Sequence, residues 1–232
     1  MFQIHLADDA RRRQEAAPGF SQGNVTTTSE PNLVPKTLVP KTPRGERTRQ
    51  RILVAAERQI GSHGYAETSV VSITTEARVA QGTFYVYFRS KEDVLRELVQ
   101  RMGQRLRRAL TLATAGIPDR LEAERKGLLA FFAFVRKNRN LYRVVEEAQF
   151  VDEAIYRKYY TDFAAGYRVV LEAAVARGDI SPGDAEARAW ALMGVSHMAG
   201  RRFALWDAET PFEPVVEALF DFVAHGLSPR GR

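Results

Sequence analysis

Apolar residues recur at helical spacing along most of the chain. In residues 44–60, Ile52, Ala56 and Ile60 lie four residues apart and share one face of a helix. Stripes with the same spacing run through residues 94–110, 121–135, 156–174, 182–206 and 212–223. No segment shows the apolar–polar alternation expected of a half-buried β-strand. The pattern predicts an all-α fold of about nine helices.

Short segments between the first stripes carry residues that end or start helices. In residues 61–65, either Gly61 or Gly64 can take the left-handed conformation that ends a helix. Thr68 or Ser69 can then cap a short helix over residues 69–76. Ser90, followed by Lys, Glu and Asp, has the pattern of a capping box and predicts the start of a long helix.

Residues 81–88, with the sequence QGTFYVYF, are amphipathic in an unusual way. On a helix, Phe84 and Phe88 share one face and can pack against the preceding short helix. The other face would leave Tyr85 as an exposed aromatic residue if it had no partner. A short helix, a four-residue turn (residues 77–80) and this segment together have the layout of a helix-turn-helix, whose second helix enters the major groove of DNA.

The chemistry of that second helix suits DNA. An amide such as Gln81 can pair with adenine, and Gly82 removes a side chain where the helix would meet the groove. A valine methyl can touch thymine, whereas hydroxyls and a lysine near a helix N-terminus can hold phosphates. The residues with these properties are Gln81, Gly82, Thr83, Tyr85, Val86, Tyr87 and Lys91.

Positive charge is concentrated in this part of the chain. The formal net charge is +6, and residues 41–108 hold 14 Lys and Arg against seven Asp and Glu. Residues 1–40 are balanced, and residues 109–232 carry one excess negative charge. A local basic block is typical of a nucleic-acid-binding module. A solvated basic surface is the alternative interpretation of the charge alone.

Residues 47–99 resemble the DNA-binding domain of the TetR family of bacterial transcriptional regulators. The similarity lies in a first helix that closes in Gly-Tyr, a Thr-initiated second helix, and the sequences GTFYVYF and SKE. It implies a three-helix helix-turn-helix domain over residues 44–92 and a larger helical ligand-binding and dimerisation domain over residues 93–228. It also implies that base edges face Gln81, Gly82, Tyr85 and Val86, and that phosphates lie near Thr68, Ser69, Thr83, Tyr87 and Lys91.

Two positions depart from the family pattern. Arg78 and Ala80 stand where the family usually has a turn glycine and a serine cap. An arginine is uncommon in a left-handed turn, and alanine is a poor helix cap. Two interpretations stay open: a remodelled turn, or an additional phosphate contact from Arg78.

The last two apolar stripes predict an interface between subunits. Residues 182–206 and 212–223 are apolar on more than one face. We expect a helix start at Ser181, with Pro at its first position, and a similar start at Thr210. Helices that are apolar on several faces need a partner, and the resemblance implies that two subunits pair through them. The chain is therefore expected to form a homodimer.

Aromatic residues gather in the middle of the second predicted domain. They can form an ordinary core or line an apolar pocket with a few polar anchors. A buried His197 can equally be a core histidine, and Arg201 a surface or interface charge. The predicted effector is hydrophobic, an acyl-CoA or an aromatic metabolite, and the candidate ligand-binding residues are Phe134, Tyr142, Tyr160, Phe163, Tyr167, Met193, His197 and Arg201.

Residues 1–43 predict a disordered or extended arm. They are rich in Thr, Pro, Ser and Gly, and LVPKT occurs at residues 33–37 and again at 38–42. The arm can be a passive tail or can lie along a phosphate backbone through Lys36, Lys41 and Arg44.

Several other classes of protein are disfavoured. The chain has no cysteine, and its apolar runs are too short for a signal peptide or membrane span. Its four histidines are far apart, and it lacks the common catalytic motifs. We expect a cytoplasmic regulator, with no enzymatic activity, metal, cofactor or membrane partner. It would bind double-stranded palindromic DNA as a repressor that a ligand releases. The alternative is a DNA-binding regulator without a ligand, controlled by a protein partner or by abundance.

Overall fold

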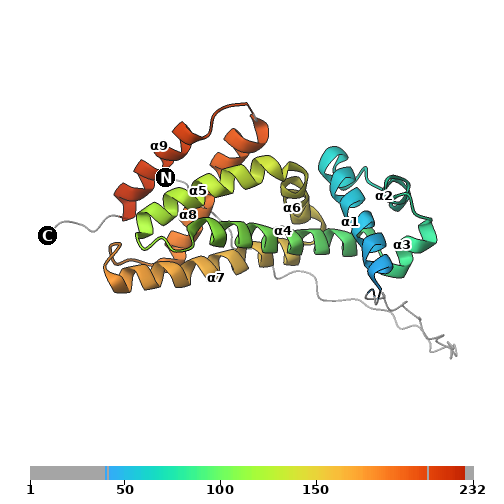
Figure 1. Cartoon of the computed structure of the whole chain (residues 1–232), viewed down its shortest axis with the longest axis horizontal. Coiled ribbons are helices and arrows are strands. Elements are labelled where there is room, and N and C mark those ends of the chain that lie inside the picture. Colours follow the sequence, from blue (N-terminus) through green and yellow to red (C-terminus); the bar gives the residue numbers. More distant parts are fainter. Residues whose placement is uncertain (1–39, 41, 208, 228–232) are drawn as a thin grey trace, which may run out of the picture. The chain divides into compact units, whose positions relative to one another are not determined.

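Helices make up the fold, as the sequence predicts (Figure 1). The structure is a computed structural model that describes residues 40, 42–207 and 209–227. Within those ranges the chain forms nine α-helices and one π-helix, and no strand. The predicted arm falls mostly outside the described residues, although its last residue, Pro43, already begins the first helix. No helix in these ranges is long and apolar enough to cross a membrane.

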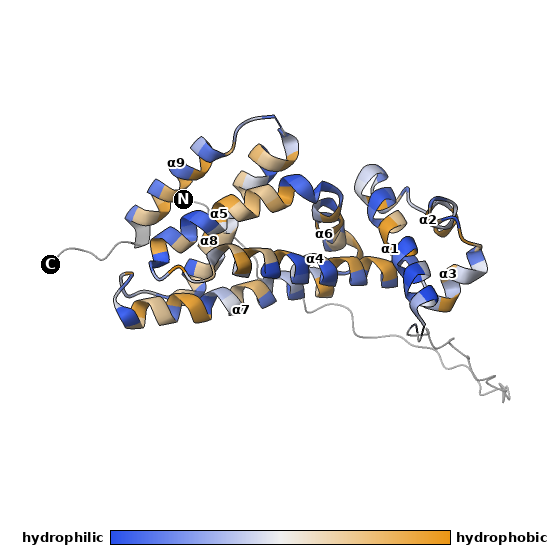
Figure 2. Cartoon of the chain, in the orientation of Figure 1, coloured by the Kyte–Doolittle hydropathy of each residue, from blue (hydrophilic) through white to orange (hydrophobic). Residues whose placement is uncertain are grey.

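The first four helices occupy the basic part of the chain. They are α1 (Pro43–His63), α2 (Val70–Ala77), α3 (Gln81–Tyr87) and α4 (Lys91–Thr114). The remaining elements are α5 (Arg120–Lys137), α6 (Arg139–Val151), α7 (Glu153–Arg177), α8 (Ala185–Gly200), the π-helix η1 (Arg201–Trp206) and α9 (Glu213–Leu227). Along α4 the ribbon alternates between hydrophilic and hydrophobic segments, as expected of a helix with one buried side (Figure 2).

Local chemistry explains where α1 begins and ends. The Thr42 hydroxyl accepts a hydrogen bond from the Gly45 N–H at 3.1 Å, and Pro43 takes the first helical position. Gly64 follows the last residue of α1 with a φ of +85°. Gly61 instead lies buried inside α1, where an added Cβ would come within 2.4 Å of the Asn140 side chain. Of the two candidate glycines, Gly64 ends the helix and Gly61 permits close packing of α1 on α6.

One continuous core joins the first three helices to the rest. Phe84 and Phe88 are buried, which confirms their predicted packing role. They share this core with Ile52 of α1 and Ile73 of α2. The same core continues through α4 to α5 and α6.

The predicted helix over residues 182–206 is wrong at both ends. Its cap is Asp184, which accepts a hydrogen bond from the Ala187 N–H at 2.9 Å, so α8 starts later than expected. Ser181 is buried instead, and its hydroxyl accepts a hydrogen bond from Arg188 at 3.1 Å. After Gly200 the backbone widens into the π-helix.

The predicted start of the last helix also differs. The first backbone hydrogen bond of α9 runs from the Val216 N–H to the Phe212 carbonyl at 2.8 Å. The Thr210 hydroxyl donates to Asp207 instead of capping α9. The hydroxyls of Ser181 and Thr210, which the sequence pattern predicts as helix caps, thus form hydrogen bonds with nearby charged residues instead.

Candidate DNA-binding surface and effector cavity

The outer face of α3 is a free surface. Tyr85 and Val86 are 46% and 40% exposed, although the same short helix buries Phe84 completely. Gln81 and Gly82 are exposed as well, and a Cβ added to Gly82 would meet nothing within 4 Å. The structure therefore brings the four predicted base-facing residues together on one exposed face of α3.

The flanking hydroxyl residues of α3 are half-buried. Thr83 donates its backbone N–H to the Ala80 carbonyl at 2.9 Å. The Tyr87 hydroxyl lies beside Gly45 at the start of α1, where an added Cβ would be 3.3 Å away. These two residues border the exposed face, at the side where the N-terminus of α1 approaches α3.

The turn between α2 and α3 keeps a left-handed residue without a glycine. Arg78 has φ and ψ of 51° and 51°. The Arg51 guanidinium of α1 donates to the carbonyls of Ala77 and Arg78, the latter at 2.7 Å. Ala80 precedes α3 without a side-chain cap. The turn thus keeps a left-handed residue at this position, and the Arg78 side chain is exposed just before α3.

Two predicted phosphate contacts are engaged inside the protein. Thr68 is 2% exposed, and its hydroxyl donates to the Gly64 carbonyl at 2.8 Å. The Lys91 ammonium donates to the carbonyls of Tyr65 and Thr68, both at 2.6 Å, and lies 3.9 Å from the Tyr65 ring centre. Carbonyls in the loop after α1 need donors, and these side chains supply them. Both residues thus have an internal contact that the sequence did not predict.

Ser69 lies where a phosphate contact is expected. It is exposed at the N-terminus of α2, where its hydroxyl accepts from the Ser72 N–H at 3.0 Å. The Ser72 hydroxyl accepts from the Ser69 N–H at 3.0 Å, which completes a capping box. Of the two residues named as possible caps, Ser69 is the cap.

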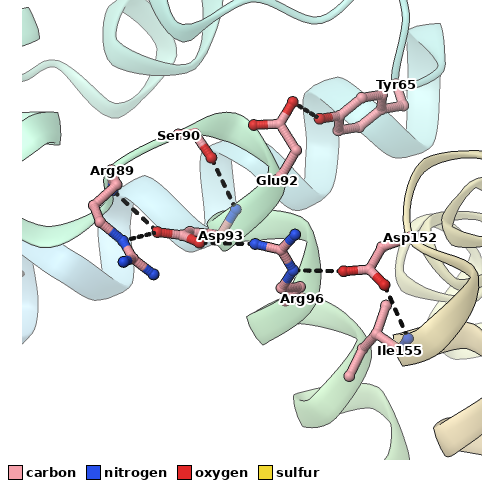
Figure 3. Close-up of polar contacts among 8 residues, drawn as sticks. All are labelled: Tyr65, Arg89, Ser90, Glu92, Asp93, Arg96, Asp152 and Ile155. Atoms are coloured by element: carbon pink, nitrogen blue, oxygen red, sulfur yellow. Dashed lines mark hydrogen bonds and ion pairs between the residues drawn. The ribbon is translucent and has the colours of Figure 1, made fainter. Parts of the chain in front are cut away.

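The N-terminus of α4 is fixed by a polar network (Figure 3). The Ser90 hydroxyl accepts from the Asp93 N–H at 3.4 Å, and the Asp93 carboxylate accepts from Arg89 and Arg96. The hydroxyls of Ser90 and Tyr65 hold the pKa of the Glu92 carboxyl at about 2. This carboxylate is therefore charged at neutral pH and helps to hold α4 against the loop after α1.

Arg96 connects this network to the second half of the chain. Its Nε donates to Asp152 at 2.5 Å, and Asp152 caps α7 by accepting from the Ile155 N–H at 3.1 Å (Figure 3). The hydrogen bond from Arg96 lowers the pKa of the Asp152 carboxyl. A change in the position of α7 would therefore act directly on α4.

Helix α6 makes a second connection to the first helix. Arg143 donates to the Gly61 carbonyl at 3.0 Å, next to the close approach of Gly61 and Asn140. The Glu147 carboxylate accepts from the Tyr65 N–H at 3.3 Å. Helices α4 and α6 thus both join the helix-turn-helix to the remaining helices.

A cavity of about 310 Å³ lies among α4, α5, α6, α7 and α8. Residues missed at the sequence level include Arg107, Glu124 and Phe131, which also line it. Phe134 and Arg201 do not line this cavity. The other six candidate ligand-binding residues all do: Tyr142, Tyr160, Phe163, Tyr167, Met193 and His197.

One polar cluster of the lining is centred on His197. Its Nδ1 lies 2.8 Å from the Tyr142 hydroxyl and 3.3 Å from the Tyr160 hydroxyl, and its Nε2 lies 3.4 Å from Glu146. Burial lowers the pKa of His197, so the imidazole is neutral at pH 7. Arg201 forms an ion pair with Glu146 behind this cluster. This pairing explains why Arg201 does not reach the cavity.

A second polar cluster contains a buried carboxylate. Glu124 is 5% exposed and accepts hydrogen bonds from Tyr167 and Arg120. Burial raises the pKa of Glu124, and the charge of Arg120 opposes this effect. In the sequence, Arg120 and Glu124 have the spacing of an ordinary surface pair, which gives no sign that they are buried.

Large apolar side chains remain exposed on the last helices. Trp190 and Met198 of α8, Trp206 of the π-helix and Phe222 of α9 are between 41% and 68% exposed. Leu192, Val195 and Phe222 border a shallow hollow between α8 and α9. These are the segments whose apolar faces the sequence assigned to a partner subunit.

The fold and the exposed face of α3 define a class of protein, the helix-turn-helix transcriptional regulators. A model of bacterial regulatory proteins of the tetR family matches residues 52–98. This part of the chain is therefore similar to the DNA-binding domain of the TetR family.

Individual relatives agree with the family. The fatty acid metabolism regulator protein of Bacillus subtilis is 29% identical over 132 residues, which cover 55% of this chain and 66% of that protein. The regulator EthR of Mycolicibacterium smegmatis is 32% identical over 107 residues, 46% of this chain and 49% of that protein. The chain thus spans just under two thirds and about half of these two relatives.

A solved structure shares the fold. FadR from Bacillus subtilis, in complex with stearoyl-CoA, superposes with a TM-score of 0.66 at 21% identity. The match covers 77% of this chain and 98% of that chain. The similarity therefore includes the helices around the cavity as well as the helix-turn-helix.

Proposed function

We propose that this protein is a ligand-responsive repressor that binds a palindromic operator as a homodimer and is released by a small hydrophobic effector. The observation that carries the proposal is the double role of α4. Lys91 and Arg96, near its first turn, hold the loop after α1 and the start of α7. Leu106 and Leu110, three turns further on, line the cavity.

The DNA-binding step rests on the exposed face of α3. Gln81, Gly82, Tyr85 and Val86 are directed away from the core, and Ser69 is exposed at the N-terminus of α2. In a helix-turn-helix these positions meet base edges and phosphates. Lys91 and Thr68 support the surface from inside, and Arg78 adds an exposed positive charge beside it.

Dimerisation rests on the apolar side chains left exposed by α8 and α9. A paired surface would cover Trp190 and Phe222, which a monomer leaves in water. Two-fold symmetry would place two α3 helices over half-sites one DNA turn apart, about 34 Å. Sedimentation equilibrium should then give twice the mass of the chain.

The effector class follows from the cavity. Its lining is mostly apolar and aromatic, with two polar clusters, as in sites for small amphipathic molecules. One relative is named for fatty acid metabolism, and the structurally similar FadR binds stearoyl-CoA. Both support an acyl effector for this chain. The cavity also favours a ligand-responsive regulator over one controlled only by a protein partner or by abundance.

A gel-shift experiment tests the proposal. The full chain is mixed with the DNA upstream of its own coding region at fixed salt, and a panel of acyl-CoAs and aromatic acids is added. We expect a dimer–DNA complex that one class of effector dissociates, because that effector binds the DNA-incompetent state more tightly. A stable complex that no member of the panel weakens would contradict effector control and favour a regulator without a ligand.

A further inference from the structure

The charged residues of the cavity lining are unevenly paired. The Lys, Arg, Asp and Glu residues that line the cavity are Arg107, Arg120 and Glu124. Arg120 and Glu124 neutralise each other in an ion pair. Within the described part of the chain, Arg107 makes no ion pair and no hydrogen bond. Its guanidinium carbon lies 5.3 Å from the centre of the Phe163 ring, a cation–π contact. One uncompensated positive charge therefore remains at the cavity wall.

A glycine inside α4 makes room for this guanidinium. Gly103 is buried one helical turn before Arg107, at a position where alanine would stabilise the helix. An added Cβ at Gly103 would come within 3.1 Å of Nη1 and 3.5 Å of Nη2 of Arg107. The Arg107 side chain therefore folds back over Gly103, toward Tyr159 and Phe163 of α7.

The neighbouring phenol is also without a partner. Tyr159 is buried to 9% exposure and packs edge-on against Tyr160. Among the described residues its hydroxyl has no hydrogen bond, whereas the hydroxyls of Tyr142, Tyr160 and Tyr167 all have one. A Cβ added to Gly103 would lie 3.1 Å from Nη1 of Arg107 and 3.5 Å from Cδ2 of Tyr159, so the guanidinium and the edge of this ring both lie beside Gly103. An unpaired cation and an unpaired hydroxyl thus share one wall of the cavity.

From this arrangement we infer that Arg107 and Tyr159 form an anchor for the anionic head group of the effector, whose apolar tail lies among the aromatic residues. The inference rests on the proposed function and makes it more specific. An arginine fork and a phenol are together suited to the oxygens of a carboxylate or a phosphate. Arg107 thereby takes the role that the sequence suggested for Arg201, which Glu146 neutralises.

Three probes share a ten-carbon chain and differ in their head group: decanoate, decan-1-ol and decanoyl-CoA. Their binding to the full chain of the protein is measured by calorimetry. The variants are Arg107→Gln, Arg107→Lys and Tyr159→Phe, and the control is Arg108→Gln. Arg108 is exposed on the same helix and does not line the cavity. Decan-1-ol reports whether a variant has damaged the cavity itself.

Arg107→Gln should weaken binding of an anionic probe about tenfold or more, because a charge-assisted hydrogen bond is lost. Binding of decan-1-ol should change less than about threefold, because this probe carries no charge and a neutral hydrogen bond contributes less. Arg107→Lys should restore part of the loss, since it keeps the charge without the fork. Tyr159→Phe should also weaken binding of the anionic probe about tenfold, because its hydroxyl would donate to a charged oxygen. If Arg107→Gln weakens binding of decanoate, the anchor recognises a carboxylate. If it weakens binding of decanoyl-CoA alone, the anchor recognises the phosphates of coenzyme A.

Two results overturn the anchor and differ in what they leave standing. If Arg107→Gln weakens all three probes equally, or none, the anchor is wrong and the apolar effector cavity survives. If the unmodified protein binds none of the three probes, the proposed acyl effector is wrong and the anchor is rejected with it.

Discussion

The helix-turn-helix and the cavity differ in where their polar groups find partners. On α3 the groups of Gln81 and Tyr85 face water and are free for an outside partner. Around the cavity most polar groups satisfy one another, as in the pairs of His197 with Tyr142 and Glu124 with Arg120. The first arrangement suits a large polar ligand such as DNA. The second suits a mostly apolar ligand with one charged group, because Arg107 is the one charge of the described lining that no ion pair neutralises.

The strongest test of the packing side of this comparison is Phe84→Ala. Phe84 is fully buried between the helices of the helix-turn-helix, so its loss should lower the free energy of unfolding by about 3–5 kcal/mol. Chemical denaturation followed by circular dichroism measures the effect. Val71→Ala, at an exposed valine of α2, is the matched control and should change stability little. A small effect of Phe84→Ala would show that α3 is not held by this contact.

Tyr85→Ala tests the surface side. Tyr85 contributes little to the core, so stability should hardly change, whereas operator binding should weaken by about 1–3 kcal/mol. Fluorescence anisotropy with a labelled operator measures the affinity. Leu112→Ala, at an exposed residue of α4, provides the control. An unchanged binding curve would remove Tyr85 from the DNA-binding surface.

Lys91→Ala separates internal support from phosphate contact. The ammonium holds two loop carbonyls, so its removal should lower the free energy of unfolding by about 1–3 kcal/mol. Lys126→Ala removes a lysine that makes only a surface ion pair and should cost less. Unchanged stability, together with a salt dependence of DNA binding that falls by about one phosphate contact, would instead show that Lys91 turns outward to DNA.

The smallest expected effect is a pH dependence of stability that arises from the histidine of the cavity lining. Burial lowers the pKa of His197 below its usual 6.5. When the pH falls below 6.5, the unfolded chain takes up a proton that the folded chain refuses, so stability should decrease toward acid. Thermal melts between pH 7.5 and about pH 5.5 cover a window around the usual histidine pKa. Over this window His197→Gln should lose less stability than the unmodified protein. The same change at exposed His225 is the matched control, and an identical loss in all three proteins would exclude His197 as its source.

The fold and the α3 surface could be predicted because both depend on local spacing. The positions of Phe84 and Tyr85 follow from helical periodicity, and residues 81–88 form the expected helix but for its last residue. The cavity depends on which helices meet in space. Sequence spacing therefore placed Phe134 and Arg201 among its candidates and missed Arg107 and Glu124.

The same distinction explains which contacts around the helix-turn-helix could not be predicted. The positions of Thr68 and Lys91 favour a phosphate contact, and spacing gave no sign that both side chains also donate to carbonyls of the loop after α1. Arg78 keeps the left-handed turn with help from Arg51, which lies 27 residues earlier in the chain. Contacts between residues so far apart in the sequence produce no periodic pattern, so they could not be predicted from it.

The most direct test of effector control is reciprocal binding. The affinity of the full chain for its effector is measured by calorimetry with and without saturating operator DNA, at one salt concentration. If filling the cavity and binding DNA oppose each other through α4, operator DNA should weaken effector binding by the same factor by which the effector weakens operator binding. An effector affinity that is equal with and without operator DNA would contradict the account.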